Sequence, residues 1–433
     1  MTLTKVVIYT FIAAIAITGA AYAYRKPQNL FIAFIKNFLG AFLIFSGAVK
    51  AIDPLGTAYK MHDYFIAFGG FFPKLDPLTL PLAIFMVVLE IVLGIALIIG
   101  SYRKLTVITT GLLILFFTFL TGYTYLNGFV NPKYFDKEYV AEMQAQNQEV
   151  PMIVEFDENN MKVTDCGCFG DFLKIEPRLS FYKDIFLMVL IIILLMSLSK
   201  ITPLFAGSKA GLIILLVSTA ITFIFCLSNY VTDLPMVDFR PYKKGNNIPQ
   251  LMVPEREAEQ EFTFIYENSN SGEVKSFDMK NLPKKEDGWV FKDREVNIID
   301  PGIPAKISNF LVLNEEGEEV NADLLEDENY NFWIVAYSLE KTKKSVFENK
   351  LNDLATKAQS DGYQVYAIAS DANDDFRHDV QAAYPFYTAD ATFLKTIVRS
   401  NPGLVLVKNG VIIDKWHHKH IPTYEELKSE YLK

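Results

Sequence analysis

Six long apolar runs in the first half of this 433-residue chain constrain its fold more than any other feature. Each run has about 20 residues, the length that an α-helix needs to cross the hydrocarbon core of a bilayer. Because lipid offers a backbone no hydrogen-bond partners, the runs are expected to be helices. They lie near residues 6–23, 30–52, 79–100, 105–127, 181–199 and 210–228. The sequence predicts an α-helical polytopic membrane bundle of about six helices, surrounded by the lipid bilayer.

Short basic loops indicate how the bundle is oriented. The loops after runs one, three and five carry basic residues and no acidic ones: Arg25, Lys26, Arg103, Lys104, Lys200 and Lys209. The positive-inside rule places them on the cytoplasmic side of a bacterial inner membrane. The N-terminus, the loops at 53–78 and 128–180, and the C-terminal half are then expected in the periplasm. Run one also fits a cleaved signal peptide, an alternative that leaves these sides unchanged.

The charge of the chain changes sharply near residue 230. Residues 231–433 carry 24 Lys/Arg and 35 Asp/Glu, although the net charge of the whole chain is only −9. An acidic soluble half lacks the basic face that nucleic acids require, so no nucleic-acid partner is expected. We expect a membrane domain at 1–230, a linker with a β-hairpin at 231–305 and an α/β domain at 306–433.

Two polar side chains of the apolar runs are candidate site residues. Glu90 lies mid-span, where a charge costs roughly 2.5–3.5 kcal/mol. It is either a buried structural hydrogen-bonding group or part of a proton or electron path. Lys50 ends the second run and is followed by Asp53. Lys50 either reaches Glu90 or extends to the interface by snorkelling.

Cys166 and Cys168 are two of the three cysteines, and they flank Gly167 in the predicted loop at 128–180. The glycine supplies the backbone freedom that a small disulfide ring requires. Three interpretations remain: a redox-active dithiol, a structural pair, and a metal site that would need ligands from elsewhere.

The surroundings of the pair give two further indications. Asp165 and Asp171 flank it, and negative charge raises a thiol pKa, which lowers reactivity. The third cysteine, Cys226, lies near the outer end of run six. It is either a resolving thiol for the pair or a small buried side chain.

Three segments of the first half resemble a known family. FSGAVKAIDPLGTAYKMHDYF, LEIVLGIALIIG and DCGCFGDFLK together resemble the MauE branch of the DoxX-like membrane family over roughly residues 30–200. The layout is similar to proteins of Bacteroidetes-type bacteria that fuse such a bundle to a periplasmic domain. The positions that match are Ser46, Gly47, Lys50, Asp53, Glu90, Cys166 and Cys168.

The resemblance implies a function. MauE proteins are associated with maturation of disulfide-containing periplasmic proteins beside a thioredoxin-like partner, and DoxX proteins with quinol-dependent electron transfer. A quinone is therefore an implied cofactor, and no other cofactor is evident in the sequence. The implied partners are a periplasmic client protein or subunits of an envelope complex.

The last part of the chain alternates strands with helices, which indicates an α/β layer. Strands are expected at 309–314, 331–337 and 363–370, a helix at 345–362, and a hairpin turned by Asn409-Gly410 at 403–416. A smaller hairpin is expected at 261–279. The order resembles the thioredoxin fold of TlpA-like proteins, and Pro402 matches the cis-proline position of that family.

This α/β domain departs from the family at its reactive site. Where a working thioredoxin has Cys-x-x-Cys, the chain has Ser338-Leu339-Glu340-Lys341, and no cysteine follows Cys226. The domain is therefore predicted to be inactive in dithiol exchange and to serve as a docking surface or a lid over the cysteine pair.

His417, His418 and His420 form a cluster that suggests metal binding. Neighbouring side chains of an extended segment point to opposite faces, so only His418 and His420 would share one. A solvated strand end is the favoured interpretation, and no metal is expected.

Three functions compete on these grounds. The first is an inner-membrane component of thiol–disulfide protein maturation, with Cys166 and Cys168 as the redox centre and electrons passing onward to a quinone. The second is a non-enzymatic scaffold in which the cysteines are structural. The third is a small-molecule transporter, for which no inverted repeat or broken helix pair is visible.

Overall fold

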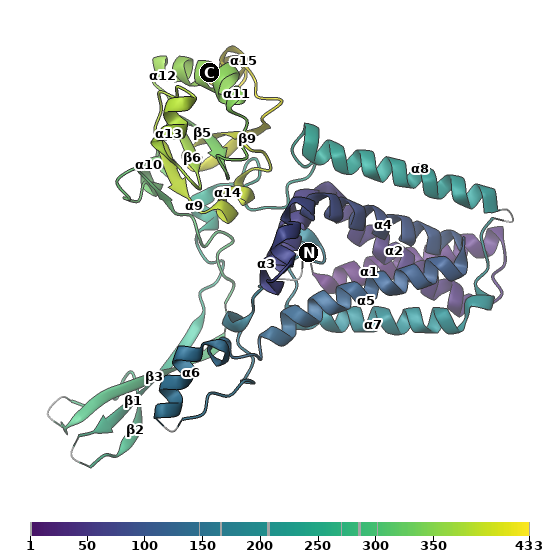
Figure 1. Ribbon diagram of the computed structural model, residues 1–433, viewed down its shortest axis with the longest axis horizontal. Helices are drawn as coiled ribbons and strands as arrows, with labels where there is room; N and C mark the ends of the chain where they lie inside the picture. Colours follow the sequence, from purple (N-terminus) through teal and green to yellow (C-terminus); the bar gives the residue numbers. More distant parts are fainter. Residues whose placement is uncertain are drawn as a thin grey trace. The chain divides into compact units, whose positions relative to one another are not determined.

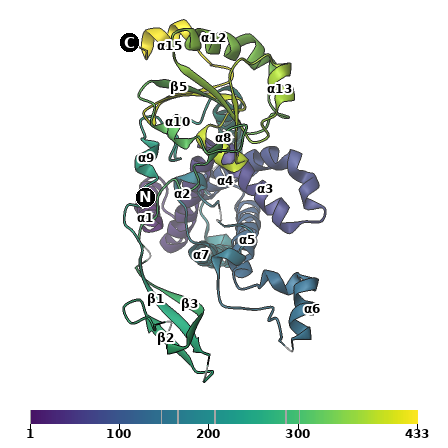
Figure 2. The same cartoon turned by 90° about the vertical axis from the view of Figure 1, so that its left-hand side faces the viewer.

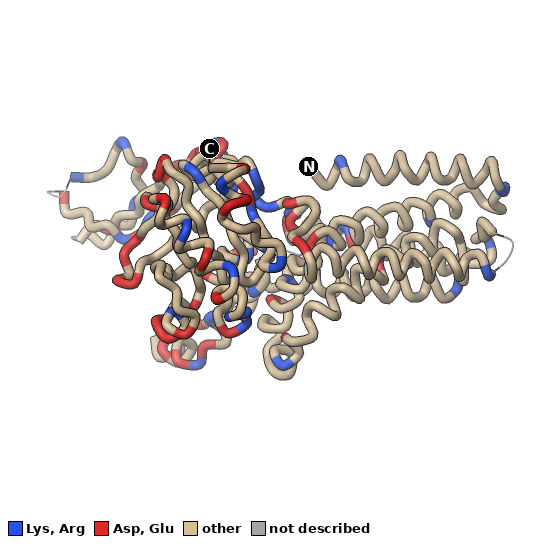
Figure 3. Tube along the Cα trace, turned by 90° about the horizontal axis from the view of Figure 1, so that it is seen from above, with Lys and Arg blue, Asp and Glu red and all other residues tan. Residues whose placement is uncertain are grey.

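The computed structural model describes residues 2–146, 148–164, 167–205, 208–269, 271–284, 287–300 and 302–432. The chain divides into two compact units, Met1–Phe239 and Arg240–Lys433. The first is helical, and the second is built on two β-sheets (Figure 1, Figure 2). Figure 3 shows charged residues spread over the second unit, whereas in the helical bundle most of them gather near helix ends.

In the described part of the chain, six helices are long and apolar enough to cross a membrane. They are α1 (Leu3–Tyr24), α2 (Leu30–Ile52), α4 (Thr79–Ile99), α5 (Arg103–Asn127), α7 (Pro177–Met196) and α8 (Ser208–Leu227). The predicted six-helix membrane bundle is confirmed, and the chain is a membrane protein. Its helices end where the sequence allows: Asn29 caps α2 by accepting from the Ile32 amide at 3.0 Å, and Gly100 ends α4 in the left-handed conformation.

Glycines bring α2 and α4 into close contact. A Cβ atom at Gly94 would lie 2.7 Å from the carbonyl oxygen of Gly40, and one at Gly40 would lie 2.7 Å from the carbonyl oxygen of Gly94. Small residues of this kind let helix backbones approach closely in a membrane. The contact sets the register between α2, which carries Lys50, and α4, which carries Glu90.

Short helices occupy the segments that were expected to be loops. After α2, the chain forms α3 (Pro54–Phe68) and the 3-10 turn η1 (Phe72–Leu78). Asp53 is the N-cap of α3, since its side chain accepts from the Gly56 amide at 3.0 Å. Between α5 and α7 lie η2 (Pro132–Phe135), α6 (Lys137–Ala145), η3 (Glu158–Asn160) and η4 (Gly170–Phe172). Two more turns, η5 (Leu198–Lys200) and η6 (Ser228–Thr232), flank α8.

The smaller sheet of the second unit has three antiparallel strands in the order β2-β1-β3. They are β1 (Glu259–Asn268), β2 (Val274–Asp278) and β3 (Trp289–Asp300). The expected hairpin at 261–279 corresponds to β1 and β2. The third strand was not predicted, because its charged KDRE stretch hides the alternation of a strand.

The larger sheet has six strands in the order β4-β7-β6-β5-β8-β9. They are β4 (Val312–Leu313), β5 (Tyr330–Ala336), β6 (Gln364–Ala369), β7 (Phe386–Ala389), β8 (Gly403–Lys408) and β9 (Val411–His417). Strands β5, β6 and β7 are parallel, whereas β8 is antiparallel to both β5 and β9. The βαβ and ββα halves give a thioredoxin-like fold, as expected. The strand expected at 309–314 is shorter, with only Val312 and Leu313 paired.

Helices cover this sheet and enclose its core. They are α9 (Ile248–Leu251), α10 (Asn321–Leu325), α11 (Lys344–Val346), η8 (Phe347–Leu351), α12 (Asn352–Ser360), α13 (Asp374–Asp379), α14 (Ala391–Ile397) and α15 (Tyr424–Glu430). The helix expected at 345–362 is the run α11–η8–α12. Fully buried Phe332, Ile334, Leu404 and Leu406 project from β5 and β8 into the core.

Candidate functional site

A cavity of about 790 Å³ lies inside the helical unit. Its walls come from α2, α3, α4, α5, the segment before α7, and α7 itself. Most of the lining is aromatic or aliphatic, including Phe42, Tyr64, Phe68, Phe85, Phe116 and Phe119. The polar lining residues are Ser46, Thr57, Lys60, Lys50, Glu90, Thr121, Lys162, Cys168, Lys183 and Asp184. A mainly apolar cavity with few polar groups is typical of a small-molecule site.

Lys50 and Glu90 form a buried ion pair at this cavity. The Lys50 ammonium lies 2.7 Å from Glu90 Oε2, and the two side chains are 6% and 2% exposed. The ammonium also donates to Ser46 Oγ at 3.2 Å and lies 4.8 Å from the centre of the Phe117 ring. In this structure Lys50 therefore turns inward to Glu90 and does not snorkel to the interface. Asp53, the third polar residue of this segment, caps α3.

Cys168 is held against the same helix. Ser46 Oγ donates to the Cys168 carbonyl oxygen at 3.1 Å, and the residue is half-buried. Next to it, Phe169 is fully buried. The centre of its ring lies 5.8 Å from the ring centre of Phe42 and 6.0 Å from that of Phe45.

The chain before Cys168 approaches α3 closely. Gly167 adopts φ +59°, and a Cβ atom there would lie 2.6 Å from Lys60 Cγ. Glycine therefore satisfies both the left-handed backbone and the lack of space.

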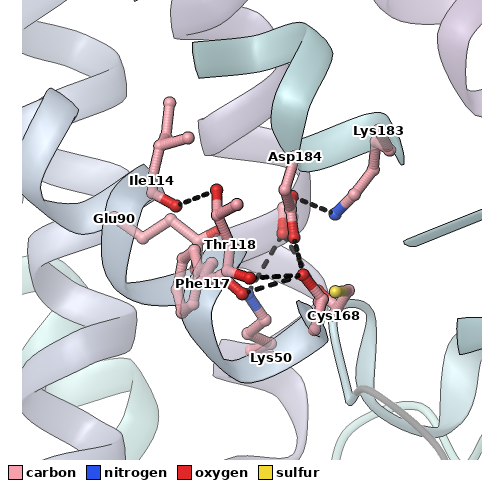
Figure 4. A network of polar contacts seen from close by, with 10 residues as sticks. Lys50, Glu90, Ile114, Phe117, Thr118, Cys168, Lys183 and Asp184 are labelled. Carbon is pink, nitrogen blue, oxygen red and sulfur yellow. Dashed lines mark hydrogen bonds and ion pairs between the residues drawn. The ribbon is translucent and has the colours of Figure 1, made fainter. Parts of the chain in front are cut away.

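Lys183 and Asp184 form a second buried ion pair, which the sequence analysis did not identify. The Lys183 ammonium lies 2.9 Å from Asp184 Oδ1, and their side chains are 10% and 2% exposed. Asp184 Oδ2 accepts from Thr121 Oγ1 of α5 at 3.0 Å. Figure 4 shows the residues of both ion pairs together with Cys168. The available signal was the Lys-Asp pair just inside the fifth apolar run.

Two opposing effects act on the Cys168 thiol. Burial raises its pKa, because a thiolate is poorly stabilised away from water. The positive charge of Lys183 is the largest effect in the opposite direction, followed by that of Lys50, whereas Asp184 raises the pKa further. Reactivity of this thiol therefore depends on the neighbouring cations.

Of the other two cysteines, the structure describes Cys226 and not Cys166. Cys166 and Asp165 lie outside the described residues. Cys226 is fully buried in a separate apolar cluster with Ala51, Ile84, Val87 and Ile91. Cys168 and Cys226 are both free thiols, so they are not bonded to each other.

In the thioredoxin-like fold, the Ser338–Lys341 segment and the Pro402 loop lie at the reactive-site position and contain no cysteine. The Asn401–Pro402 peptide bond is cis. The Asn401 amide donates to the Ser338 carbonyl oxygen at 2.7 Å, which ties the Pro402 loop to the Ser338–Lys341 segment. The backbone amide of Leu339 donates to Asp371 at 3.0 Å. Among the residues that the structure describes, no three His, Cys, Asp or Glu side chains are placed to hold a metal ion.

His417 is buried, which corrects the expectation of a solvated strand end. Its side chain is 4% exposed, and its ring lies 4.1 Å from that of His418. His417 Nδ1 accepts from the Lys419 amide at 3.4 Å, so this nitrogen is unprotonated. Burial lowers the pKa of both His417 and His418 to about 4.

Acidification is expected to destabilise the C-terminal unit between pH 6.5 and 4. In this window the unfolded chain protonates both rings, whereas the folded unit keeps them neutral. Stability that is present above pH 6.5 is therefore lost as the pH falls to 4, by at most about 3 kcal/mol for each ring. Hydrogen-exchange protection of β8 and β9 in the full chain, corrected for the intrinsic effect of pH, measures this loss.

The control for this pH dependence is the exposed His378 of α13. His378→Gln should keep the slope of the free energy of unfolding against pH, whereas His417→Gln with His418→Gln should flatten it. Equal slopes in both variants would contradict the assignment.

Comparison with known proteins adds two matched segments. Residues 28–132 match the family of the methylamine utilisation protein MauE. This MauE segment contains α2 to α5 and hence the Lys50–Glu90 pair, whereas Cys168, Lys183 and Asp184 lie beyond it. Residues 260–301, which cover β1 to β3, match a domain of unknown function.

Curated proteins and solved structures were also compared with the chain. No curated protein matches. A solution structure of a candidate protein disulfide isomerase from Bacteroides thetaiotaomicron matches 28% of this chain and 82% of its own, with 14% identity and a TM-score of 0.22.

Proposed function

We propose that this protein carries out thiol–disulfide chemistry in the bacterial envelope, passing electrons from client thiols through Cys166 and Cys168 to a quinone in the cavity. One observation carries the proposal: the Cys168 residue lines an apolar cavity that also contains two buried ion pairs. The MauE match of residues 28–132 supports a role for the bundle beyond anchoring.

The chemistry of the cavity suits a quinone. Its volume of about 790 Å³ lies within the usual range for small-molecule sites. Aromatic walls would hold a flat apolar ring and its isoprenoid tail. The ammonium groups of Lys50 and Lys183 would be the donors to the two carbonyl oxygens that a quinone presents. As these carbonyls are reduced, negative charge develops on oxygen, which such cations stabilise.

The proposed reaction balances without another reactant. A client dithiol reduces the Cys166–Cys168 disulfide by thiol–disulfide exchange, so the client gains a disulfide and the pair becomes a dithiol. The pair then gives two electrons and two protons to the quinone. The sulfur–sulfur bond of Cys166 and Cys168 forms again, and the quinone leaves as a quinol.

The orientation is also part of the proposal. The basic loops of residues 25–26, 103–104 and 200–209 would face the cytoplasm, with the cysteine pair and both chain ends in the periplasm. That compartment is oxidising enough for a disulfide to persist. The thioredoxin-like fold has no cysteine, so its proposed role is to bind the client.

A single-turnover experiment tests the proposal. The full chain is reduced in lipid vesicles, separated from the reductant and mixed with a short-chain ubiquinone. We expect about one equivalent of quinol by ultraviolet absorbance, and loss of two free thiols by alkylation mass spectrometry. Cys166→Ser with Cys168→Ser should form no quinol.

Two further variants complete the experiment: a matched control, and a variant that lacks the third thiol. Ser218→Ala in α8 should behave as the unmodified chain, since its hydroxyl donates to the Leu215 carbonyl oxygen within the same helix. Cys226→Ser decides whether Cys226 resolves the pair. Quinol formation by the doubly substituted protein would reject the redox proposal and leave a scaffold role.

A further inference from the structure

Lys183 lies where it can act on the Cys168 sulfur. It belongs to the second turn of α7 and is 10% exposed. Its ammonium lies 5.5 Å from the ring centre of Phe169, the residue after Cys168, and 5.8 Å from that of Phe42. The positive charge of the lysine opposes the effect of burial on the pKa of the thiol. Backbone anchoring by Ser46 keeps Cys168 in this position.

Lys50 and Asp184 are the other charged groups that act on the Cys168 thiol. Lys50 of α2 is bound to Glu90 of α4 at 2.7 Å. Asp184 of α7 is negative, and Thr121 of α5 donates to its second oxygen. Of the described residues, Lys183 is therefore the main cation available to the sulfur.

We propose that Lys183 is a positioning residue whose ammonium stabilises the Cys168 thiolate inside the cavity. This inference rests on the proposed function only for the use of that thiolate in exchange. The thiolate is the nucleophile and the leaving group of thiol–disulfide exchange, and burial disfavours it. A nearby ammonium offsets that cost, while Asp184 keeps the lysine near the sulfur and moderates its effect.

Alkylation kinetics test this role without a quinone or a client. The full chain with Cys166→Ser and Cys226→Ser is placed in lipid nanodiscs and treated with iodoacetamide from pH 6 to pH 10. Labelling of Cys168 is followed by mass spectrometry. We expect Lys183→Met to slow labelling at pH 7 about tenfold, the effect of one pKa unit, and to shift the rise of the labelling rate to higher pH.

Substitution of Asp184 is expected to change the rate of Cys168 labelling in the opposite direction. Asp184→Asn removes a negative charge beside the thiol, so labelling at pH 7 should become about threefold faster. Lys183→Arg keeps the positive charge and should stay within about threefold of the parent. The matched control is Lys36→Met, because Lys36 is a buried lysine of α2 that donates to Asn37 and to the Ile98 carbonyl oxygen, outside the cavity.

Two results would overturn the inference. One is a Lys183→Met rate at pH 7 within twofold of the parent. The other is a change of the same sign in Lys183→Met and Asp184→Asn, since altered access to the sulfur would produce it. Either result leaves the quinone experiment untouched, because that experiment depends on electron transfer by the cysteine pair.

Discussion

Glu90→Gln is expected to destabilise the helical unit by about 3–5 kcal/mol, because it leaves the Lys50 ammonium buried without a counter-charge. The pair is joined at 2.7 Å, with side chains 6% and 2% exposed, so water cannot compensate for the loss. Unfolding of the full chain by sodium dodecyl sulfate in mixed micelles measures the change in free energy.

A double variant distinguishes the cost of leaving one charge unpaired from the cost of losing the ion pair as a whole. Lys50→Met with Glu90→Gln removes both charges, and it should recover most of the lost stability, since a neutral pair has no unpaired charge to bury. Asp63→Asn is the matched control. It breaks the partly exposed Lys60–Asp63 pair of α3, which should cost no more than about 1 kcal/mol. A single Glu90→Gln variant as stable as the parent would show that Lys50 is solvated.

Gly94→Ala is expected to destabilise the bundle by about 1–3 kcal/mol, and Gly94→Leu by more, through overpacking. The added Cβ would lie 2.7 Å from the Gly40 carbonyl oxygen and 2.8 Å from Ile44 Cγ1. The oxygen belongs to a helix backbone, so only a shift of α2 against α4 can relieve the contact. Thermal unfolding in nanodiscs reports the loss.

Gly19→Leu is the control for the glycine contact. Gly19 lies on the exposed side of α1, and a Cβ atom there meets nothing within 4 Å. This variant should unfold at the same temperature as the parent or slightly higher, because glycine is a poor helix former. Similar destabilisation by Gly19→Leu and Gly94→Ala would rule out a specific contact between α2 and α4.

The six spans could be predicted because hydropathy is a property of consecutive residues. Lys50 and Glu90 could be identified as candidate site residues from the sequence, because each is a charged residue in an apolar run. Their contact depends on the register of two helices, which the close approach at Gly40 and Gly94 determines. Glycine spacing alone does not reveal which helices meet, so the sequence left the pairing of Lys50 open.

Lys183 and Asp184 were harder to predict. Charges at the start of an apolar run are typical of the membrane interface, and that interpretation leaves them in contact with headgroups. In the structure, Lys183 lies beside the rings of Phe169 and Phe42, and Asp184 accepts from Thr121 of α5. By contrast, α3 had a readable signal in Asp53-Pro54, an N-cap followed by proline in the first turn.

Phe169 has a consequence for how Cys168 can meet a redox partner. A fully buried aromatic ring in contact with Phe42 and Phe45 cannot leave without opening a void worth roughly 3–5 kcal/mol. The neighbouring Cα atom is only about 3.8 Å away along the chain, so the sulfur can swing through a few ångströms at most. Any molecule that exchanges electrons with Cys168 must therefore travel to a stationary sulfur.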